Sequence, residues 1–286
     1  MRDYAGMGNL EVWYSSIGEQ GILDALSPEA RKIAARIMAK ARQRGHTQVL
    51  EKMAELVDDK QRIVEDAPLI VRETHTAAGR PIKEALADTL NLYFDSLPDD
   101  RKSLLVRYRI VDVARKVVGV GSVGTRCWVI LMNGNGAEDP LFLQYKEAQA
   151  SVLAPYSKTP GWESEGRRVV VGQRLIQGAP DIFLGWGKTG PTHFYMRQLR
   201  DMKGGIEFDP KNVKTFPEYC KLCGWALALA HAKSGDPAAI AGYLGKSEGM
   251  DEAVAGFAAA YADQTDRDYD ALVKAAKAKR IPVAKT

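Results

Sequence analysis

A short stretch in the middle of the chain holds residues whose types and spacing could bind a phosphate group. Gly119, Gly121 and Gly124 follow the pattern G-x-G-x-x-G, with Ser122 inside it. Glycine at this spacing lets backbone N–H groups close around a phosphate, because no Cβ holds the ligand away and positive φ angles cost little. Lys146 stands in an apolar run further along and could place a positive charge on the same phosphates. The chemistry that this set indicates is the binding of a phosphorylated ligand.

The residues after the third glycine decide between two folds that use this spacing. In a Rossmann fold a helix follows, and the pyrophosphate sits at its N-terminus. Here the run 127–132, Cys-Trp-Val-Ile-Leu-Met, has no helical period and is typical of a strand. Asn-Gly-Asn-Gly at 133–136 predicts a turn, and 141–145 predicts the next strand. We therefore expect an antiparallel meander and not a Rossmann oxidoreductase.

A strand, a glycine loop, a strand, a turn and a strand that ends in a lysine resemble the start of the small lobe of protein kinases. In that lobe the loop covers a nucleotide, and the lysine holds its α- and β-phosphates. The resemblance implies that Glu163 or Glu165, near the start of the next helix, pairs with Lys146. It also places Gln198 and Leu199 at a hinge whose backbone could bind an adenine edge. The alternative is an ordinary meander with a surface lysine and carboxylates that complement a helix dipole.

Two further groups of residues have the types that could form a site. Cys220 and Cys223 lie three residues apart on a predicted helix, but a zinc site needs a second ligand pair at matching spacing, so we expect core cysteines. His231 followed by Asp236 could be taken for a kinase catalytic loop, yet no asparagine follows at matching spacing and the segment is typical of a helix end. No catalytic residue and no metal site is assigned.

Helices are expected before and after the sheet along the chain, packing together as a helical lobe. Ser27-Pro28-Glu29 predicts a helix start. The first hundred residues are expected to form a helical layer, with helices from 28 to about 44, from 47 through 57 and from 81 to near 98, and an irregular stretch at 63–71. Beyond Lys146 we expect a loop at 151–161, a helix through 169–176, strands at 181–186 and 193–199 joined by a turn at 185–190, and helices at 219–233, 250–261 and 269–278.

Composition indicates an ordinary globular protein. The chain has 286 residues, 45% of them hydrophobic, which suffices for one large domain or two lobes. A net charge of +4, from 40 basic and 36 acidic residues, is too small to indicate a nucleic-acid partner. Three cysteines make no disulfide framework, no apolar run approaches the ~18 residues of a membrane span, and the N-terminus lacks a secretory signal. We expect a cytoplasmic protein without a membrane partner.

Longer phrases resemble the uncharacterised bacterial family called domain of unknown function 2252. They occur in the same order from about Tyr4 to Ile281: RYRIVDVARKVVGVGSVGTRCWVILM, DPLFLQYKEAQASVL, GQRLIQGAPDIFLGW, FYMRQLRDMKG, CGWALALAHAKSGD and YADQTDRDYDALV. The resemblance implies a relation to protein kinases and aminoglycoside phosphotransferases with the order of elements permuted. It also implies ATP and Mg²⁺ as ligands.

The chain departs from this family in its acidic motifs. Members carry a Gly-Asp-x-His loop with a later Asn, and an Asp-Phe-Asp-like segment, before the region that these residues cover, and neither string occurs here. Phosphoryl transfer needs carboxylates that hold Mg²⁺ and orient the acceptor hydroxyl. We therefore expect a nucleotide-binding protein that is inactive by itself, with an unknown acceptor substrate and a separate chain that could supply the missing part. The alternative is a non-catalytic binding or interaction module that keeps only the fold.

These inferences give an α+β, protein-kinase-like fold, permuted and N-terminally incomplete. We expect a helical segment of the larger lobe at 1–107, an antiparallel β lobe with the glycine loop at 108–203, and a second helical segment of the larger lobe at 204–286.

Overall fold

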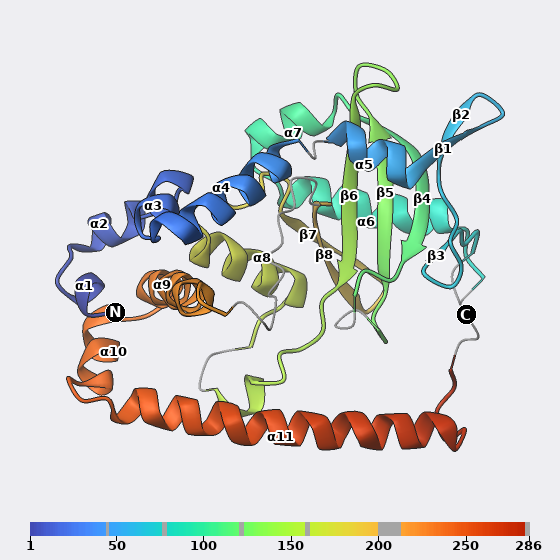
Figure 1. Cartoon of the computed structure of the whole chain (residues 1–286). Coiled ribbons are helices and arrows are strands. Elements are labelled where there is room, and N and C mark those ends of the chain that lie inside the picture. The colour runs from blue at the N-terminus through green and yellow to red at the C-terminus, as the bar shows by residue number, and fades with distance from the viewer. Residues whose placement is uncertain (44–45, 76–78, 120–122, 158–160, 200–212, 284–286) are drawn as a thin grey trace.

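A computed structural model describes residues 1–43, 46–75, 79–119, 123–157, 161–199 and 213–283 (Figure 1). The strands are β1 (Ala54–Val57), β2 (Lys60–Ile63), β3 (Ile70–Val71), β4 (Arg109–Lys116), β5 (Cys127–Asn133), β6 (Pro140–Glu147), β7 (Gly185–Thr189) and β8 (Thr192–Gln198). The helices are α1 (Arg2–Ala5), α2 (Asn9–Tyr14), α3 (Glu19–Asp24), α4 (Pro28–Arg42), α5 (His46–Met53), α6 (Ile82–Ser96), α7 (Asp99–Leu105), the 3₁₀ turn η2 (Ala154–Tyr156), α8 (Glu165–Ile176), α9 (Phe216–Ser234), α10 (Pro237–Leu244) and α11 (Gly249–Lys277). The fold is mixed α and β, with a small antiparallel sheet.

One six-stranded sheet organises the centre of the molecule. Its strand order is β3-β4-β5-β6-β8-β7, and each neighbouring pair is antiparallel. The apolar runs at 127–132 and 141–145 form the buried middle strands β5 and β6, as predicted. β1 and β2 form a separate hairpin.

The register fixes which side chains share a face of the sheet, because directly opposed residues point the same way. Lys146 is opposite Cys127 on β5 and Tyr195 on β8. Phe142 and Gln144 lie on this same face by alternation along β6. Tyr145 and Phe194 point to the other face and stack with ring centroids 4.1 Å apart.

Each face is covered by different helices (Figure 1). Tyr93 of α6 belongs to the core on the Tyr145 face. Phe142 packs with Leu50 of α5 on the opposite face. The start of α8 lies on this second face too, because the N–H of Glu165 donates to the His193 ring, whose strand position alternates with that of Phe194. We call the side that holds Lys146 the α8 face.

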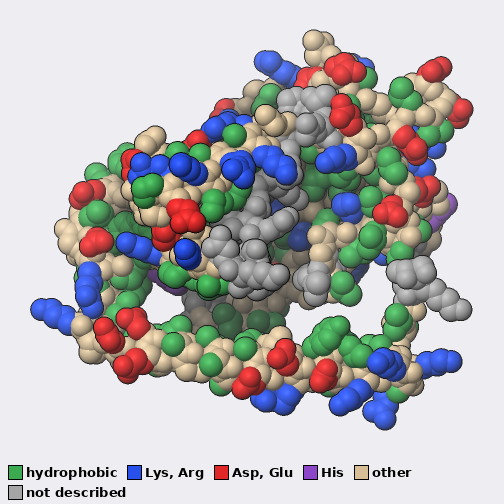
Figure 2. Space-filling model, viewed as in Figure 1, with side chains coloured by type: hydrophobic (Ala, Val, Ile, Leu, Met, Phe, Trp, Pro, Cys, Tyr) green, Lys and Arg blue, Asp and Glu red, His purple; other side chains and the backbone are tan. Residues whose placement is uncertain are grey.

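The remaining helices form a second body of the molecule. Tyr4 of α1 and Val12 of α2 pack against Leu229 of α9 in a small separate core. Ser27 caps α4 by accepting the Ala30 N–H, with Pro28 in the first turn, as the sequence predicts. Helix α11 runs along one side of the molecule and has no buried residue (Figure 1). Figure 2 shows Lys and Arg side chains along α4 and charges of both signs along α11.

Several predicted elements are wrong in type or extent. The expected helix from 47 through 57 ends at Met53, and the chain enters the β1–β2 hairpin, so the first hundred residues are not a purely helical layer. Strand β3 belongs to the six-stranded sheet although it lies outside the 108–203 segment. Helix α6, also outside that segment, packs on the sheet. The expected turn at 185–190 is mostly strand β7. The two helices expected at 250–261 and 269–278 are one continuous helix, α11.

Candidate functional site

Lys146 lies on the α8 face, near the end of β6 and opposite the first residue of the strand that follows the glycine loop. Its side chain is half-buried between cross-strand neighbours Cys127 and Tyr195. Among the residues that the structure describes, the Lys146 ammonium forms no ion pair. A half-buried cation with no carboxylate partner leaves a positive potential on this part of the sheet.

Three cations converge at this place. Burial raises the pKa of the Cys127 thiol to about 11, while Lys146, Arg197 and Lys116 each act to lower it, in that order of strength. The strand register places all three on the Cys127 face of the sheet: Lys146 is opposite Cys127, Arg197 is opposite Gln144, and Lys116 alternates with Arg115, the partner of Trp128. They come from three different strands, β6, β8 and β4. We call Lys116, Lys146 and Arg197 the basic cluster.

A buried amide holds Arg197 in the cluster without neutralising it. The Arg197 Nε–H donates to Oε1 of Gln144 over 3.0 Å, and Gln144 is only 2% exposed. Gln144 stands opposite Arg197 in the β6–β8 register. Because an amide carries no charge, the guanidinium keeps its full positive charge for a ligand.

The glycine loop between β4 and β5 is only partly described. Gly121 and Ser122 lie outside the described residues. Gly124 has φ +83°, a conformation that favours glycine, and a Cβ added at Gly119 or Gly124 would meet no atom within 4 Å. Each of these glycines therefore has space beside its Cα.

An ion pair beside this loop joins Arg126, just before β5, to Glu147 at the end of β6. The N–H and Nε–H of Arg126 both donate to Oε2 of Glu147, over 3.0 and 2.9 Å. Burial acts to raise the pKa of Glu147, but the hydrogen bonds and charge of Arg126 outweigh it and hold that pKa below its ordinary value. The carboxylate next to Lys146 in sequence is therefore engaged by Arg126.

The two carboxylates expected to pair with Lys146 are placed differently. Glu163 is exposed just before α8. Glu165 is in the first turn of α8 and forms an ion pair with Arg168, which also donates to the Gln149 carbonyl over 2.8 Å. Neither carboxylate forms an ion pair with Lys146 in the described structure.

Gln198 and Leu199 lie where β8 ends, beside a polar cavity. The N–H of Gln198 donates to Asp181 Oδ2 over 2.6 Å, and the N–H of Leu199 donates to the Phe142 carbonyl over 2.8 Å. Both N–H groups thus have acceptors inside the chain. The cavity is about 410 Å³ in volume, and its polar lining comes from Gln173, Gln177, Asp181, Arg197 and Gln198. Arg197 belongs to this cavity and to the basic cluster, so the two are adjacent.

The remaining sequence candidates fall elsewhere. Cys220 and Cys223 are exposed on α9, so the expectation of core cysteines is wrong for this pair. His231 is exposed near the end of α9, and Asp236 caps α10 by accepting the N–H groups of Ala238 and Ala239. Helix α9 ends at Ser234 and is followed by Gly235, as predicted. The described part of the chain contains no group of three His, Cys, Asp or Glu side chains that could hold a metal ion.

Sequence reasoning missed Lys116, Cys127, Gln144 and Arg197 as members of one site. All four point to the same face of the sheet as Lys146. This can be deduced only when the strand order and the register are known. Alternation alone could have linked Gln144 to Lys146, because both point to one side of β6.

A comparison with protein families matches residues 1–275 to a family described as "Uncharacterized protein conserved in bacteria (DUF2252)". No curated protein and no solved structure matches the chain. None of the described helices is both long and apolar enough to cross a membrane.

Proposed function

The chain belongs to the bacterial family called domain of unknown function 2252, and from the geometry of its sheet we propose that it binds a nucleoside triphosphate, ATP by resemblance. The observation that carries the proposal is the basic cluster around the Cys127 thiol, at the start of β5, the strand that follows the glycine loop. Three cations on one face of a sheet attract a multiply charged anion, and a triphosphate is such an anion.

In this proposal the phosphates lie over Lys146 and under the glycine loop. The ammonium acts as a point charge on the phosphate oxygens, and the space beside the Cα of Gly124 lets a phosphate approach closely. The sequence predicts backbone donors from Gly119, Ser122 and Gly124, of which Ser122 lies outside the described residues. The Arg126–Glu147 pair supports this arrangement, because it ties the start of β5 to the end of β6 beside Lys146.

The base of the nucleotide would occupy the polar cavity. Tyr195 lies opposite Lys146, and Arg197 is two residues further along β8. The distance between these two positions is roughly 7 Å, which suits the separation of the phosphates from the base in a nucleotide. The side chains of Gln173, Gln177 and Gln198 can each donate and accept hydrogen bonds at a base edge. Side chains take this role here because the N–H groups of Gln198 and Leu199 are already bound.

We propose binding, and not phosphoryl transfer, as the activity of this chain alone. Transfer needs carboxylates for Mg²⁺ and for the acceptor hydroxyl. Glu147 and Glu165 are held by Arg126 and Arg168, and the described residues do not fit a magnesium site. No metal-dependent step is therefore derived, and a non-catalytic nucleotide-binding module is the form of the proposal that these ion pairs favour.

Calorimetric titration of the chain with ATP, comparing Lys146→Met with the native protein, tests the proposal. The loss of one charge-assisted contact of about 1.5–3 kcal/mol should weaken binding roughly 10- to 150-fold. Lys60→Met is the matched control, since Lys60 is exposed on the separate β1–β2 hairpin and its loss should leave the affinity unchanged.

Two results would contradict the proposal. Equal ATP affinity of Lys146→Met and the native chain would remove the phosphate site and leave an ordinary meander. ATP hydrolysis above the buffer rate that disappears in His231→Ala would show that the segment after α9 is a catalytic loop.

A further inference from the structure

Helix α11 carries a long apolar stripe that the rest of the described chain leaves uncovered. Figure 1 shows the helix running along one side of the molecule, and none of its residues is buried. Its three aromatic side chains, Phe257, Tyr261 and Tyr269, are 66%, 58% and 64% exposed. Soluble proteins rarely leave a row of large apolar side chains in water, because covering them is favourable. The stripe therefore marks an interaction surface.

The stripe has the same spacing in both directions along the helix. Its members recur at steps of three and four residues, so they lie on one side of α11. Counted from Asp263, they stand two, six, nine and thirteen residues away on either side: Tyr261 and Thr265, Phe257 and Tyr269, Val254 and Leu272, Met250 and Ala276. Two antiparallel copies of α11 that meet at Asp263 therefore bring each member opposite its counterpart. Such self-complementarity about a two-fold axis is what a symmetric dimer requires.

The charges at the two ends of α11 favour an antiparallel pair. Residues 248–252 include three acidic residues and no basic one: Glu248, Asp251 and Glu252. Residues 274–280 include four basic residues and no acidic one: Lys274, Lys277, Lys279 and Arg280. Within the described part of the chain, neither end forms an ion pair. An antiparallel arrangement places each acidic end beside the partner's basic end and opposes the helix dipoles, whereas a parallel one places like charges together.

The middle of the stripe can be covered without leaving polar groups unpaired. The hydroxyl of Thr265 donates to the Tyr261 carbonyl over 2.8 Å, so it keeps its acceptor when water is excluded. Asp268, at the edge of the stripe, accepts a hydrogen bond from the Gln264 amide over 2.7 Å. The rings of Phe257 and Tyr261 already stack, with centroids 5.5 Å apart. Two aromatic anchors are therefore in contact before a partner arrives.

The area of the stripe suffices for a specific interface. An aromatic side chain buries about 150–250 Å², so covering the exposed parts of the three aromatic residues removes roughly 300–450 Å² per copy. Met250, Val254 and Leu272, each at least 40% exposed, add to this area. Two copies together then remove roughly 1,000 Å² from water, which is near the lower limit of specific interfaces. We expect a reversible dimer.

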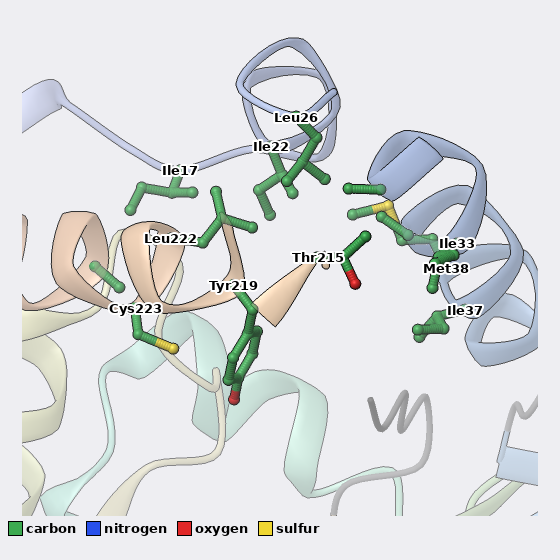
Figure 3. A pocket seen from close by; sticks show the side chains of 13 residues that line it. Ile17, Ile22, Leu26, Ile33, Ile37, Met38, Thr215, Tyr219, Leu222 and Cys223 are labelled. Atoms are coloured by element: carbon green, nitrogen blue, oxygen red, sulfur yellow. The ribbon is translucent and has the colours of Figure 1, made fainter. Parts of the chain in front are cut away.

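Two other ways of covering the stripe fit less well. The apolar cavity between α3, α4 and α9 has a volume of about 320 Å³, and Figure 3 shows Ile22, Ile37 and Leu222 converging on it. One helical turn with its side chains occupies roughly 400–600 Å³, and the stripe extends over about seven turns, so this cavity of a second copy cannot hold it. Helices that lie on membranes have a basic polar face, whereas that of α11 is mainly acidic as far as Asp270.

We propose that α11 joins two copies of this chain into a symmetric dimer, in which the two helices lie antiparallel and meet at Asp263. The stripe of each copy covers the stripe of the other, and the acidic end of each helix lies beside the basic end of its partner. No member of the stripe belongs to the basic cluster or lines the polar cavity, so the dimer and the proposed nucleotide site can be tested separately.

Light scattering during size-exclusion chromatography of the full chain tests the proposal. We expect the mass to rise from one copy to two as the concentration increases. Phe257→Asp should raise the dissociation constant of the dimer roughly 100-fold or more, because both copies lose an aromatic anchor and gain a charge. Ala259→Asp is the matched control: Ala259 is exposed and lies about 200° around the helix from Phe257, so the dissociation constant should not change. Both variants should keep the circular dichroism of the native chain.

Disulfide cross-linking tests the direction of the two helices, in a chain that carries Cys220→Ser and Cys223→Ser. A mixture of Val254→Cys and Leu272→Cys should form cross-linked dimers under oxidising conditions. Val254→Cys alone should not, because its two cysteines would be 18 residues apart along the pair, or roughly 27 Å.

Four results would overturn the proposal. The first is the mass of a single copy at every concentration up to the millimolar range, and the second is a dimer that Phe257→Asp leaves intact. The third is cross-linking of Val254→Cys alone, which would show a parallel pair. The fourth is binding of a monomeric native chain to phosphatidylglycerol vesicles that Phe257→Asp abolishes, because a membrane would then cover the stripe.

Discussion

Gly166 is a position where helix α8 lies in close contact with the sheet. A Cβ built at Gly166 would lie 2.1 Å from the Phe194 carbonyl oxygen and 3.0 Å from Cβ of Trp186. The nearest atom belongs to the backbone of β8 and cannot rotate away. Gly166→Ala therefore forces α8 off the strand by about 1 Å, and Val170, which is fully buried on the same helix, loses contacts.

Gly172 on the same helix gives the matched control. A Cβ there meets no atom within 4 Å, so Gly172→Ala gains helix propensity without overlap, about 0.5–1 kcal/mol of added stability. Gly166→Ala gains a similar term but costs about 1–3 kcal/mol for overpacking. The helix-propensity term is common to both, so the two alanine variants should differ in free energy of unfolding by about 1–3 kcal/mol.

Urea unfolding followed by circular dichroism measures this difference. The midpoints should move in opposite directions while the slope of free energy against urea stays the same, because both variants bury nearly the same surface. Equal stability of Gly166→Ala and the native chain would show that α8 does not pack on β8 through this glycine. The placement of the Glu165–Arg168 pair beside the α8 face would then also be wrong.

Two further predictions concern titrating groups beside Lys146. The pKa of about 11 keeps the buried Cys127 protonated at neutral pH. Iodoacetamide should therefore label Cys220 and Cys223 quickly and Cys127 only after unfolding, as measured by mass spectrometry. Fast labelling of all three cysteines would contradict the burial of Cys127. Glu147 has a pKa below its ordinary 4.5, so its stabilising contribution is complete above that pH and is lost as the pH falls through the lowered value. Glu147→Gln should therefore lower the thermal unfolding temperature at pH 7, and the difference from the native chain should vanish in strong acid.

The sequence predicted the sheet best where strands are buried on both faces. Runs such as 127–132 are continuously apolar and end in turn residues, so neither helix period nor solvent exposure competes with the assignment. The short strands β1, β2 and β3 were missed, because each has two to four residues and depends on its partner strand. Tertiary pairing decides such segments, and local propensity does not.

Glycine misled the prediction at 185–190 for a physical reason. The pattern predicts a turn at Gly185 and Gly187, but both are in strand β7, against which α6 packs closely. A Cβ at Gly185 would come within 2.7 Å of the Tyr93 ring, and one at Gly187 within 2.8 Å of the Thr89 carbonyl. Close approach of another element is the second reason for glycine in a strand, and sequence alone cannot separate it from a turn. In α11, by contrast, the polar stretch 262–268 contains no glycine or proline, so it interrupts the apolar pattern without ending the helix.

The candidate site was predictable in its parts but not as a whole. Lys146 and the glycines stand out by motif, whereas the basic cluster depends on β8 lying between β6 and β7, which no local pattern indicates. Gln144 shows the limit most clearly. A glutamine in an apolar run looks like a surface residue, yet it is buried because its amide holds the guanidinium of a strand more than 50 positions away.

The geometry around Lys146 bears on whether the proposed nucleotide site is suited to binding alone or to phosphoryl transfer. For Lys146 to be positioned as in a phosphotransferase, a carboxylate on α8 must hold its ammonium, and Glu165 is the carboxylate that α8 offers in its first turn. Glu165 is bound to Arg168, which is itself anchored on the Gln149 carbonyl just after β6. Moving Glu165 to Lys146 would leave Arg168 without its carboxylate. A triphosphate would neutralise Lys146 without that exchange, since it brings its own negative charge to the cluster. The contacts of Glu165 and Arg168 on α8 thus favour the proposed anion-binding site over a site that is already arranged for phosphoryl transfer.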